Sequence, residues 1–324
     1  MATLGWTADR LGRRTFLVVV ACVFGLGIAG LALAGGFWPL VLAVVVLSSA
    51  TGLYDVGINA SAVDLEQVTG RRFMSFLHAG FSGGAMLGAV GTGVLIQAGV
   101  DYRIVYLGML VPLAAVILAV ATTRFPAAAN GSSEDAGEKG SGLTRHLPLL
   151  LVGLIATLGL LSEGEMEHWS GIYLRQSLGL PALLGGSGVA VFYAAMAAGR
   201  LGTAWAVRSF GNRRTLLAAG LFTAGGMGLA LATREPLLVV CGFLVVGLAL
   251  SGVAPIAFSA AGDLAPGRAG GAISAVTTLG YGGFLLGPVV VGGLAELLGL
   301  RVALGTIAAA GVLIFVLGLR LKGA

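Results

Sequence analysis

Long apolar stretches alternate with short polar loops along the whole chain. About ten of these stretches run for roughly 20 residues with few or no charges, the length that an α-helix needs to cross a bilayer. We expect membrane-spanning helices at residues 15–35, 38–62, 74–98, 102–123, 147–167, 184–207, 213–233, 236–258, 270–296 and 299–320. The pattern therefore predicts an all-α membrane protein.

The composition supports this prediction and adds an expectation about helix packing. Hydrophobic residues make up 57% of the chain and charged residues only 10%, with a mean hydropathy of +0.98, which excludes an ordinary soluble domain. The chain also contains 55 glycines, and small residues allow helices in lipid to approach closely. We expect such contacts at Gly84 and Gly88 and at Gly283 and Gly287.

The net charge of +5 is spread over short loops instead of one basic patch, which favours the lipid bilayer over nucleic acid as a partner. Most of the 19 Lys and Arg residues fall in loops on the same side as the amino terminus. Because basic loops stay in the cytoplasm, we expect both termini there. The chain is then integral to the plasma (cytoplasmic) membrane, the cell inner membrane.

A hydrophilic stretch and an internal repeat divide the chain. Residues Arg124 to His146 are rich in Gly, Ser and charge, so we expect a cytoplasmic linker there. It separates an amino-terminal lobe of four helices, residues 1–123, from a carboxy-terminal lobe of six, residues 147–324. The sequence DRLGRRT at 9–15 recurs as RSFGNRRT at 208–215, again just before a helix, so the lobes look like copies of one unit.

The opening loop resembles the conserved cytoplasmic loop between the second and third helices of the major facilitator superfamily, and its repeat resembles the counterpart between the eighth and ninth helices. The resemblance implies two six-helix lobes that rock around a central substrate site. It also implies that this chain lacks the first two helices, which leaves the amino-terminal lobe incomplete. We expect the two loops to act in gating through Gly5, Asp9, Arg10, Gly12, Arg13, Arg14, Arg208, Gly211, Arg213 and Arg214.

Polar residues on the expected helix 38–62 form one stripe, in which Thr51, Asp55 and Asn59 recur every four residues. A carboxylate inside a membrane is costly, so it is either functional or held by a hydrogen bond between helices. The surrounding sequence GLYDVGINASAVDLE resembles the fucose-permease branch of the superfamily, which implies a proton-coupling role for Asp55. We expect Thr51 and Asn59 to contact the substrate.

Three glutamates lie at the end of the expected helix 147–167. Glu163 and Glu167 share one helix face, whereas Glu165 points elsewhere. Two like charges on one face indicate a protonated group, an ion pair or water nearby, so we expect Glu163 in proton coupling and Glu167 in substrate binding. Trp169 follows at the interface, where it is either a substrate contact or part of an aromatic belt.

Two further features concern hydroxyl groups and one arginine. Thr278 and Tyr281 lie on the expected helix 270–296, where hydroxyls either orient a polar substrate or bond to carbonyls of their own helix. Arg200 lies within an apolar stretch, and we expect its side chain to snorkel to the cytoplasmic interface and act in gating.

The sequence has no phosphate-binding loop before a Lys-Ser or Lys-Thr pair, no metal-spaced His or Cys cluster and no catalytic triad pattern. We therefore expect neither an enzyme nor a cofactor or metal site. The leading hypothesis is a monomeric permease, a symporter that moves a small sugar-like solute with protons by alternating access. Two alternatives stay open: an antiporter that exports drugs or metabolites, and a truncated fragment or sensor that does not transport.

Overall fold

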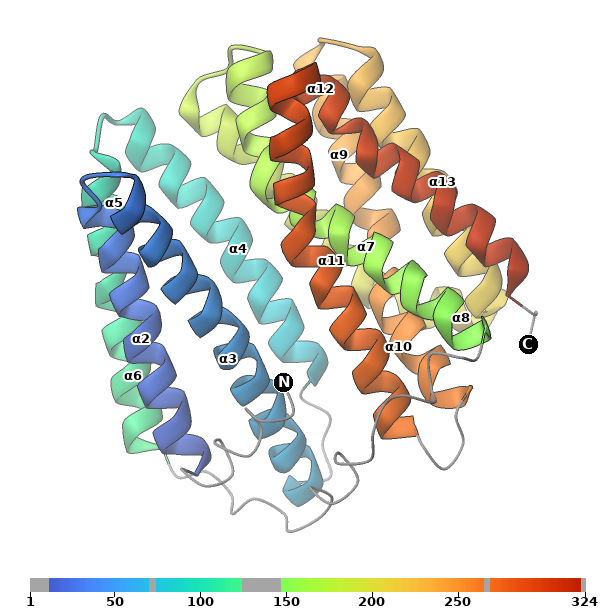
Figure 1. Cartoon of the computed structure of the whole chain (residues 1–324), viewed down its shortest axis with the longest axis horizontal. Helices are drawn as coiled ribbons and strands as arrows, with labels where there is room; N and C mark the ends of the chain where they lie inside the picture. The colour runs from blue at the N-terminus through green and yellow to red at the C-terminus, as the bar shows by residue number, and fades with distance from the viewer. Residues whose placement is uncertain (1–11, 70–73, 124–146, 265–268, 322–324) are drawn as a thin grey trace. The chain divides into compact units, whose positions relative to one another are not determined.

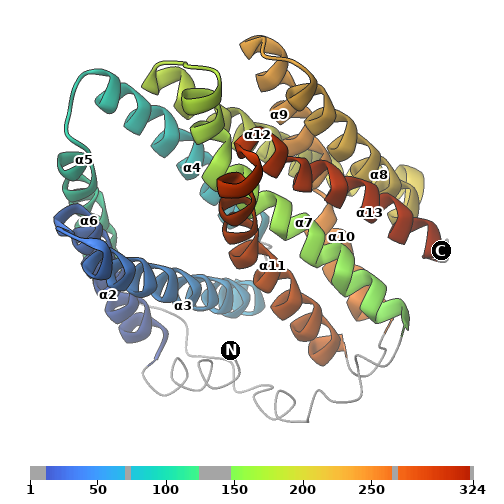
Figure 2. The same cartoon turned by 45° about the horizontal axis from the view of Figure 1, so that its top comes forward.

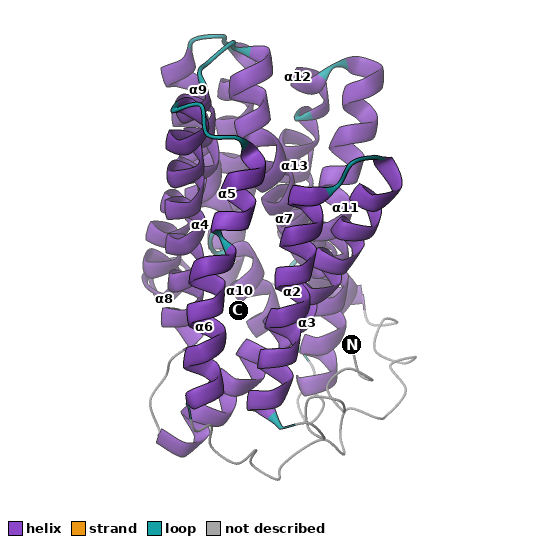
Figure 3. Ribbon diagram, turned by 90° about the vertical axis from the view of Figure 1, so that its left-hand side faces the viewer, coloured by secondary structure: helices purple, strands orange, loops and turns teal. Residues whose placement is uncertain are grey.

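A computed structural model describes residues 12–69, 74–123, 147–264 and 269–321, and every regular element within these ranges is helical (Figures 1 and 3). The elements in chain order are α2 (Arg13–Leu33), α3 (Phe37–Thr69), α4 (Met74–Gln97), α5 (Tyr102–Gly108), α6 (Leu110–Thr122), α7 (Leu147–Ile172), the π-helix η3 (Tyr173–Ser177), α8 (Ala182–Ala232), α9 (Pro236–Leu250), α10 (Val253–Asp263), α11 (Ala269–Leu298), α12 (Leu300–Ala303) and α13 (Gly305–Arg320). An apolar chain favours helices because each helix satisfies its own backbone hydrogen bonds in lipid.

The expected spans correspond to these helices. Within the described ranges, eight helical stretches are long and apolar enough to cross a membrane. Three expected spans are each built from two helices in succession: α5 with α6, α9 with α10, and α12 with α13. The longest stretch, α8, has 51 residues and combines the two spans expected at 184–207 and 213–233. The all-α membrane fold predicted from the sequence is confirmed.

Two glycines have the same unusual backbone, and both belong to the repeated loop. Gly12 precedes α2 with φ 76° and ψ 144°, and Gly211 interrupts α8 with φ 79° and ψ 162°. Only glycine adopts this region without strain, because a β-carbon would collide with the backbone. In each copy a helix begins directly after the glycine. The positive φ therefore marks the start of the following helix in both copies of the loop.

The chain divides into two compact units. The first contains Met1–His78 and Ala98–Gly137, and the second contains Ala79–Gln97 and Glu138–Ala324. Most of α4 therefore groups with the carboxy-terminal helices, whereas the lobes expected from the sequence place all of it in 1–123. In the first unit α2 packs against α3, α5 and α6. Phe16, Val20 and Ala50 form the buried core there.

In the second unit α7 lies against both α11 and α10 (Figure 2). Gly283 and Gly287 of α11 approach the carbonyl oxygens of Thr157 and Leu161 so closely that a β-carbon would collide with them. Contacts of this kind bring two helix backbones together in lipid, so the close approach expected at these two glycines is confirmed.

Within the second unit, Gly84 and Gly88 of α4 make no contact of this kind. A β-carbon added at either glycine would meet no described atom within 4 Å. The close contact of α4 instead uses Gly93, whose β-carbon position lies 3.2 Å from the Cα of Leu183 on α8. Two glycines four residues apart mark one side of a helix, but the sequence does not say whether another helix covers that side.

Candidate functional site

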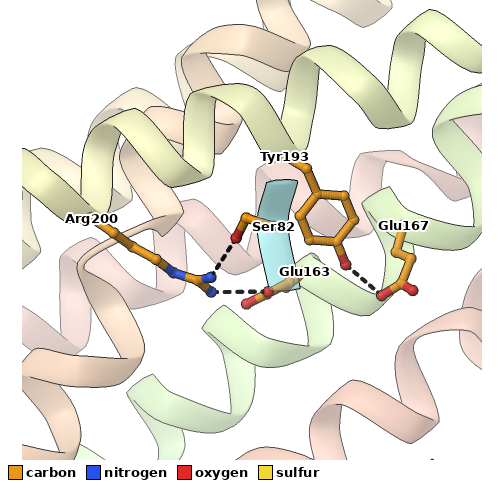
Figure 4. A network of polar contacts seen from close by, with 5 residues as sticks. All are labelled: Ser82, Glu163, Glu167, Tyr193 and Arg200. Carbon is orange, nitrogen blue, oxygen red and sulfur yellow. Dashed lines mark hydrogen bonds and ion pairs between the residues drawn. The ribbon is translucent and has the colours of Figure 1, made fainter. Parts of the chain in front are cut away.

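An ion pair lies inside the second unit, between α7 and α8 (Figure 4). The Nη2 atom of Arg200 lies 3.3 Å from the Oε1 atom of Glu163 and donates a hydrogen bond to it. The Nη1 atom donates to the hydroxyl oxygen of Ser82 on α4, at 2.9 Å. The Glu163 side chain is 9% exposed and that of Arg200 is 25% exposed. The pair is therefore largely enclosed by apolar helices.

A second polar pair lies beside the first on the same two helices (Figure 4). The Tyr193 hydroxyl of α8 donates to the Oε2 atom of Glu167 on α7, at 2.6 Å. Phe81 of α4 packs edge-on against the Tyr193 ring, with centroids 6.0 Å apart. Three helices thus contribute both polar groups and aromatic walls to one site.

Arg200 does not snorkel to the interface, so this expectation from the sequence is wrong. Its guanidinium is held at Glu163 and Ser82 within the unit. The guanidinium stays with Glu163 because a move to the interface would leave the buried carboxylate unpaired. Breaking a buried ion pair in this way costs about 3–5 kcal/mol. The sequence left three possibilities for Glu163: a protonated group, an ion pair or nearby water. The structure shows the ion pair.

The remaining side chains of this part of α7 contact α11 and α13. Glu165 is fully buried, and its Oε2 atom lies 3.0 Å from the hydroxyl oxygen of Thr306 on α13. Trp169 donates from its indole nitrogen to the carbonyl oxygen of Pro288 on α11, at 3.0 Å. Glu165 thus points away from Glu163, as the helical spacing predicts. Trp169 is partly buried and has its polar group engaged within the protein.

The other expected substrate and proton residues lie on α3 and α11. Asp55 is half-buried, and Thr51 is exposed and donates to the carbonyl of Leu47 in its own helix, at 2.8 Å. The side chain of Asn59 lies outside the described part of the structure. On α11, Tyr281 is half-buried and Thr278 is exposed.

The expected gating residues divide between the two copies of the repeated loop. Gly5, Asp9 and Arg10 lie outside the described residues. Arg13 and Arg14 open α2, and in the second copy Arg208 and Arg214 are exposed. Arg213 behaves differently, because its guanidinium donates to the carbonyls of Gly318 and Leu319 at the end of α13. Whether these residues act in gating stays a prediction.

Sequence reasoning did not select Ser82, Tyr193 or Thr306 as site residues. One signal was available for Tyr193, because it lies seven residues before Arg200 and therefore on the same face of α8. No comparable signal exists for Ser82 and Thr306, because single hydroxyls are common in membrane helices. Within the described residues, no group of three or more His, Cys, Asp or Glu side chains is arranged to hold a metal ion.

A family model described as Major Facilitator Superfamily matches residues 1–234 and, in a second overlapping match, residues 170–323. An uncharacterized MFS-type transporter of Yersinia pestis is 31% identical over 311 residues, which cover 95% of this chain and 79% of that protein. An uncharacterized transporter of Sinorhizobium fredii, y4wD, is 34% identical over 98% of this chain and 84% of its own length. The membrane protein MosC of Rhizobium meliloti is 28% identical over 97% of this chain and 76% of its own length.

Solved structures show the same fold at low sequence identity. The nucleoside transporter NupG superposes with a TM-score of 0.80 at 16% identity, covering 99% of this chain and 87% of that one. The fucose:proton symporter FucP of E. coli superposes with a TM-score of 0.65 at 15% identity, with the same coverage. At these identities the likeness is one of fold.

Proposed function

Because the chain belongs to the Major Facilitator Superfamily, a family of membrane transporters, we propose that it is a proton-coupled secondary transporter of a small polar solute. It acts as a monomer in the cytoplasmic membrane, with both termini in the cytoplasm, and works by alternating access. Two lobes, at residues 1–123 and 147–324, then move relative to each other around the solute.

The observation that carries this proposal is the pair of Glu163 and Arg200 inside an apolar bundle. A buried carboxylate paired with a guanidinium is stable while both are charged. A proton on Glu163 cancels the attraction and releases Arg200 for another acceptor. Glu163 can therefore either bind a proton or pair with Arg200. Because proton binding breaks the ion pair, it is linked to a change of conformation.

The groups beside this pair suit a polar solute. Glu167 and Tyr193 keep oxygen lone pairs beyond their mutual hydrogen bond, and these can accept hydrogen bonds from the hydroxyl groups of a sugar-like molecule. Trp169, Thr278 and Tyr281 add an aromatic ring and hydroxyls from α7 and α11. Further support comes from fold relatives whose names describe a nucleoside transporter and a fucose:proton symporter, since both of those solutes are small and polar.

The first unit supplies a second acid in this proposal. Asp55 lies half-buried on α3, with Thr51 one turn before it and Asn59 one turn after it. A carboxyl group within a span can take up a proton from one side and release it to the other as the cavity alternates. Asp55 and Glu163 are therefore the proposed proton-coupling residues, with Thr51 and Asn59 as substrate contacts.

Gating in this proposal belongs to the repeated loops and to Arg200. The charged residues of both loops, Asp9 to Arg14 and Arg208 to Arg214, then act on the cytoplasmic side, where pairs of opposite charges can hold one conformation. Replacing Asp9 by Asn is expected to slow transport while changing the solute affinity by less than about threefold, or less than about 1 kcal/mol.

The test begins with a panel of polar metabolites and the purified full chain. A solute that binds the folded protein raises the thermal midpoint, and the rise grows with the logarithm of its concentration relative to Kd, so a ligand can be identified before any transport is measured. That solute is then added outside proteoliposomes that contain a pH-sensitive dye. Solute entry is expected to acidify the interior, and Glu163→Gln is expected to abolish this signal.

The matched control is Glu296→Gln, because Glu296 is exposed near the end of α11. This variant is expected to retain proton movement. Solute uptake without any proton movement in the unaltered protein would contradict coupling, and alkalinisation of the interior would favour the exporting antiporter.

A further inference from the structure

Glu165 lies two residues from Glu163, but its surroundings are different. It is fully buried on the face of α7 that contacts α11 and α13. On α11 the β-carbon position of Gly287 lies 3.0 Å from the Cγ atom of Glu165. On α13 the contact is the hydroxyl of Thr306. No described arginine or lysine pairs with Glu165.

Two arginines that the structure describes in the second unit, Arg200 and Arg301, are engaged elsewhere. Arg200 contacts Glu163 and Ser82, and Arg301 donates to backbone carbonyls at the end of α8. The neighbouring acids on α7 have their own partners, Arg200 for Glu163 and Tyr193 for Glu167. Among the described residues, a negative charge on Glu165 would therefore have only the hydroxyl of Thr306 to stabilise it.

The hydrogen bonds of Thr306 decide where the hydrogens lie. Its Oγ1 atom is 2.7 Å from the carbonyl oxygen of Ala303 and 3.0 Å from Oε2 of Glu165. A hydroxyl carries one hydrogen, and a carbonyl oxygen can only accept. The shorter contact therefore uses the hydrogen of Thr306, and the longer contact needs a hydrogen from Glu165.

The second carboxyl oxygen agrees with this assignment. Oε1 of Glu165 is buried and has no hydrogen-bond partner among the described residues. In a carboxylate both oxygens carry negative charge, and leaving one unpaired in an apolar site is strongly unfavourable. In a carboxylic acid this atom is a neutral carbonyl oxygen, which tolerates the site far better.

We propose that Glu165 is a neutral carboxylic acid that holds its own proton and donates it to Thr306, joining α7 to α13. The donors then run in one direction, from Glu165 to Thr306 and from Thr306 to Ala303. This proton is distinct from one exchanged at Glu163, and its presence does not depend on which solute is transported. Glu165 is a positioning residue that fixes the start of α13 against α7.

The test is infrared spectroscopy of the full-length protein at neutral pH. The spectrum is expected to contain the carbonyl band of a protonated carboxyl group, and Glu165→Gln is expected to remove it. Glu296→Gln, which replaces an exposed glutamate, is expected to leave the band in place. A spectrum in which Glu165→Gln removes only carboxylate bands would overturn the proposal.

Two variants of Thr306 give a second, independent measurement. Thr306→Val removes the acceptor and is expected to shift the carboxyl band, whereas Thr306→Ser keeps the hydroxyl and the band position. If Glu165→Gln does not fold, this comparison decides the question, and an identical band in both Thr306 variants would contradict the proposal. Loss of transport alone would not, because the infrared band reports protonation and not solute movement.

Discussion

Arg213 and Arg301 cap opposite ends of the same pair of helices. Arg213, which opens the second part of α8, donates to the carbonyls of Gly318 and Leu319 at 3.4 and 3.2 Å, at the end of α13. Arg301, at the start of α12, donates to the carbonyl of Leu231 at 2.8 Å, at the end of α8. The last carbonyls of a helix lack partners within it and carry partial negative charge, so a guanidinium is well suited to both positions.

These caps give the first prediction. Arg301→Ala is expected to lower the free energy of unfolding by about 1–3 kcal/mol, because the carbonyls at the end of α8 lose a charged donor. The measurement is the thermal midpoint of the purified protein in detergent. Arg234→Ala is the control, since Arg234 is exposed in the adjacent loop. Equal midpoints for the two variants would contradict the capping role.

The second prediction concerns Gly211. Gly211→Ala is expected to destabilise the protein by about 1–3 kcal/mol, because alanine cannot adopt φ 79° and ψ 162° without strain. Gly202→Ala lies in the same helix, where a β-carbon would meet nothing within 4 Å. Thermal midpoints of the two variants provide the comparison, and a loss confined to Gly202→Ala would show that the backbone at Gly211 is not restrictive.

The third prediction concerns the pair of Glu163 and Arg200. Arg200→Ala alone leaves an unpaired carboxylate, whereas Arg200→Ala combined with Glu163→Gln leaves none. The double variant is therefore expected to be more stable than Arg200→Ala. The loss in Arg200→Ala should fall below the about 3–5 kcal/mol of a fully buried pair, because Arg200 is 25% exposed. Additive losses across this double-mutant cycle would show that the two side chains do not interact.

The fourth prediction tests the contact of α7 with α11. Gly283→Ala is expected to cost about 1–3 kcal/mol, because its β-carbon would collide with the carbonyl of Thr157. Gly282→Ala changes the neighbouring residue, where a β-carbon would meet nothing within 4 Å. Only Gly283→Ala is expected to lower the thermal midpoint. A lower midpoint in Gly282→Ala alone would contradict the prediction, because it would mean that a different face of α11 packs against α7.

The fifth prediction tests the acid on α3. Asp55→Asn removes a titratable group but nearly preserves its shape, so it is expected to abolish solute accumulation driven by a pH gradient while solute exchange persists. Asp263→Asn, at the exposed end of α10, is the control and is expected to retain accumulation. Undiminished accumulation by Asp55→Asn would exclude it as the coupling residue.

The membrane helices were predictable because lipid imposes one requirement on every span, a long apolar helix. The repeated loops were also readable, since Gly12 and Gly211 share a motif and proved to share a backbone conformation. The face shared by Glu163 and Glu167 followed from helical spacing alone. These features depend on residues that are near each other in sequence.

The partners of the polar side chains were not predictable in the same way. Arg200 contacts Ser82, which is 118 positions away in the chain, and Thr306 contacts Glu165 across 141 positions. Such contacts depend on how each helix is rotated about its axis. Because the spans are apolar on nearly every face, the sequence does not show which face packs against a neighbour. For this reason the expected snorkelling of Arg200 was wrong, and within the second unit the close contact of α4 lies at Gly93 instead of Gly84.

The pairing of Glu163 with Arg200 also has an electrical consequence. While both groups are charged, the pair has no net charge, and the membrane voltage does no work when the pair is exposed first to one side and then to the other. A proton on Glu163 leaves one positive charge, and a full crossing of the field by that charge is worth about 2.3 kcal/mol for each 100 mV. In the proposed transport cycle, a negative interior therefore drives the protonated form inward and leaves the return of the unprotonated pair insensitive to voltage.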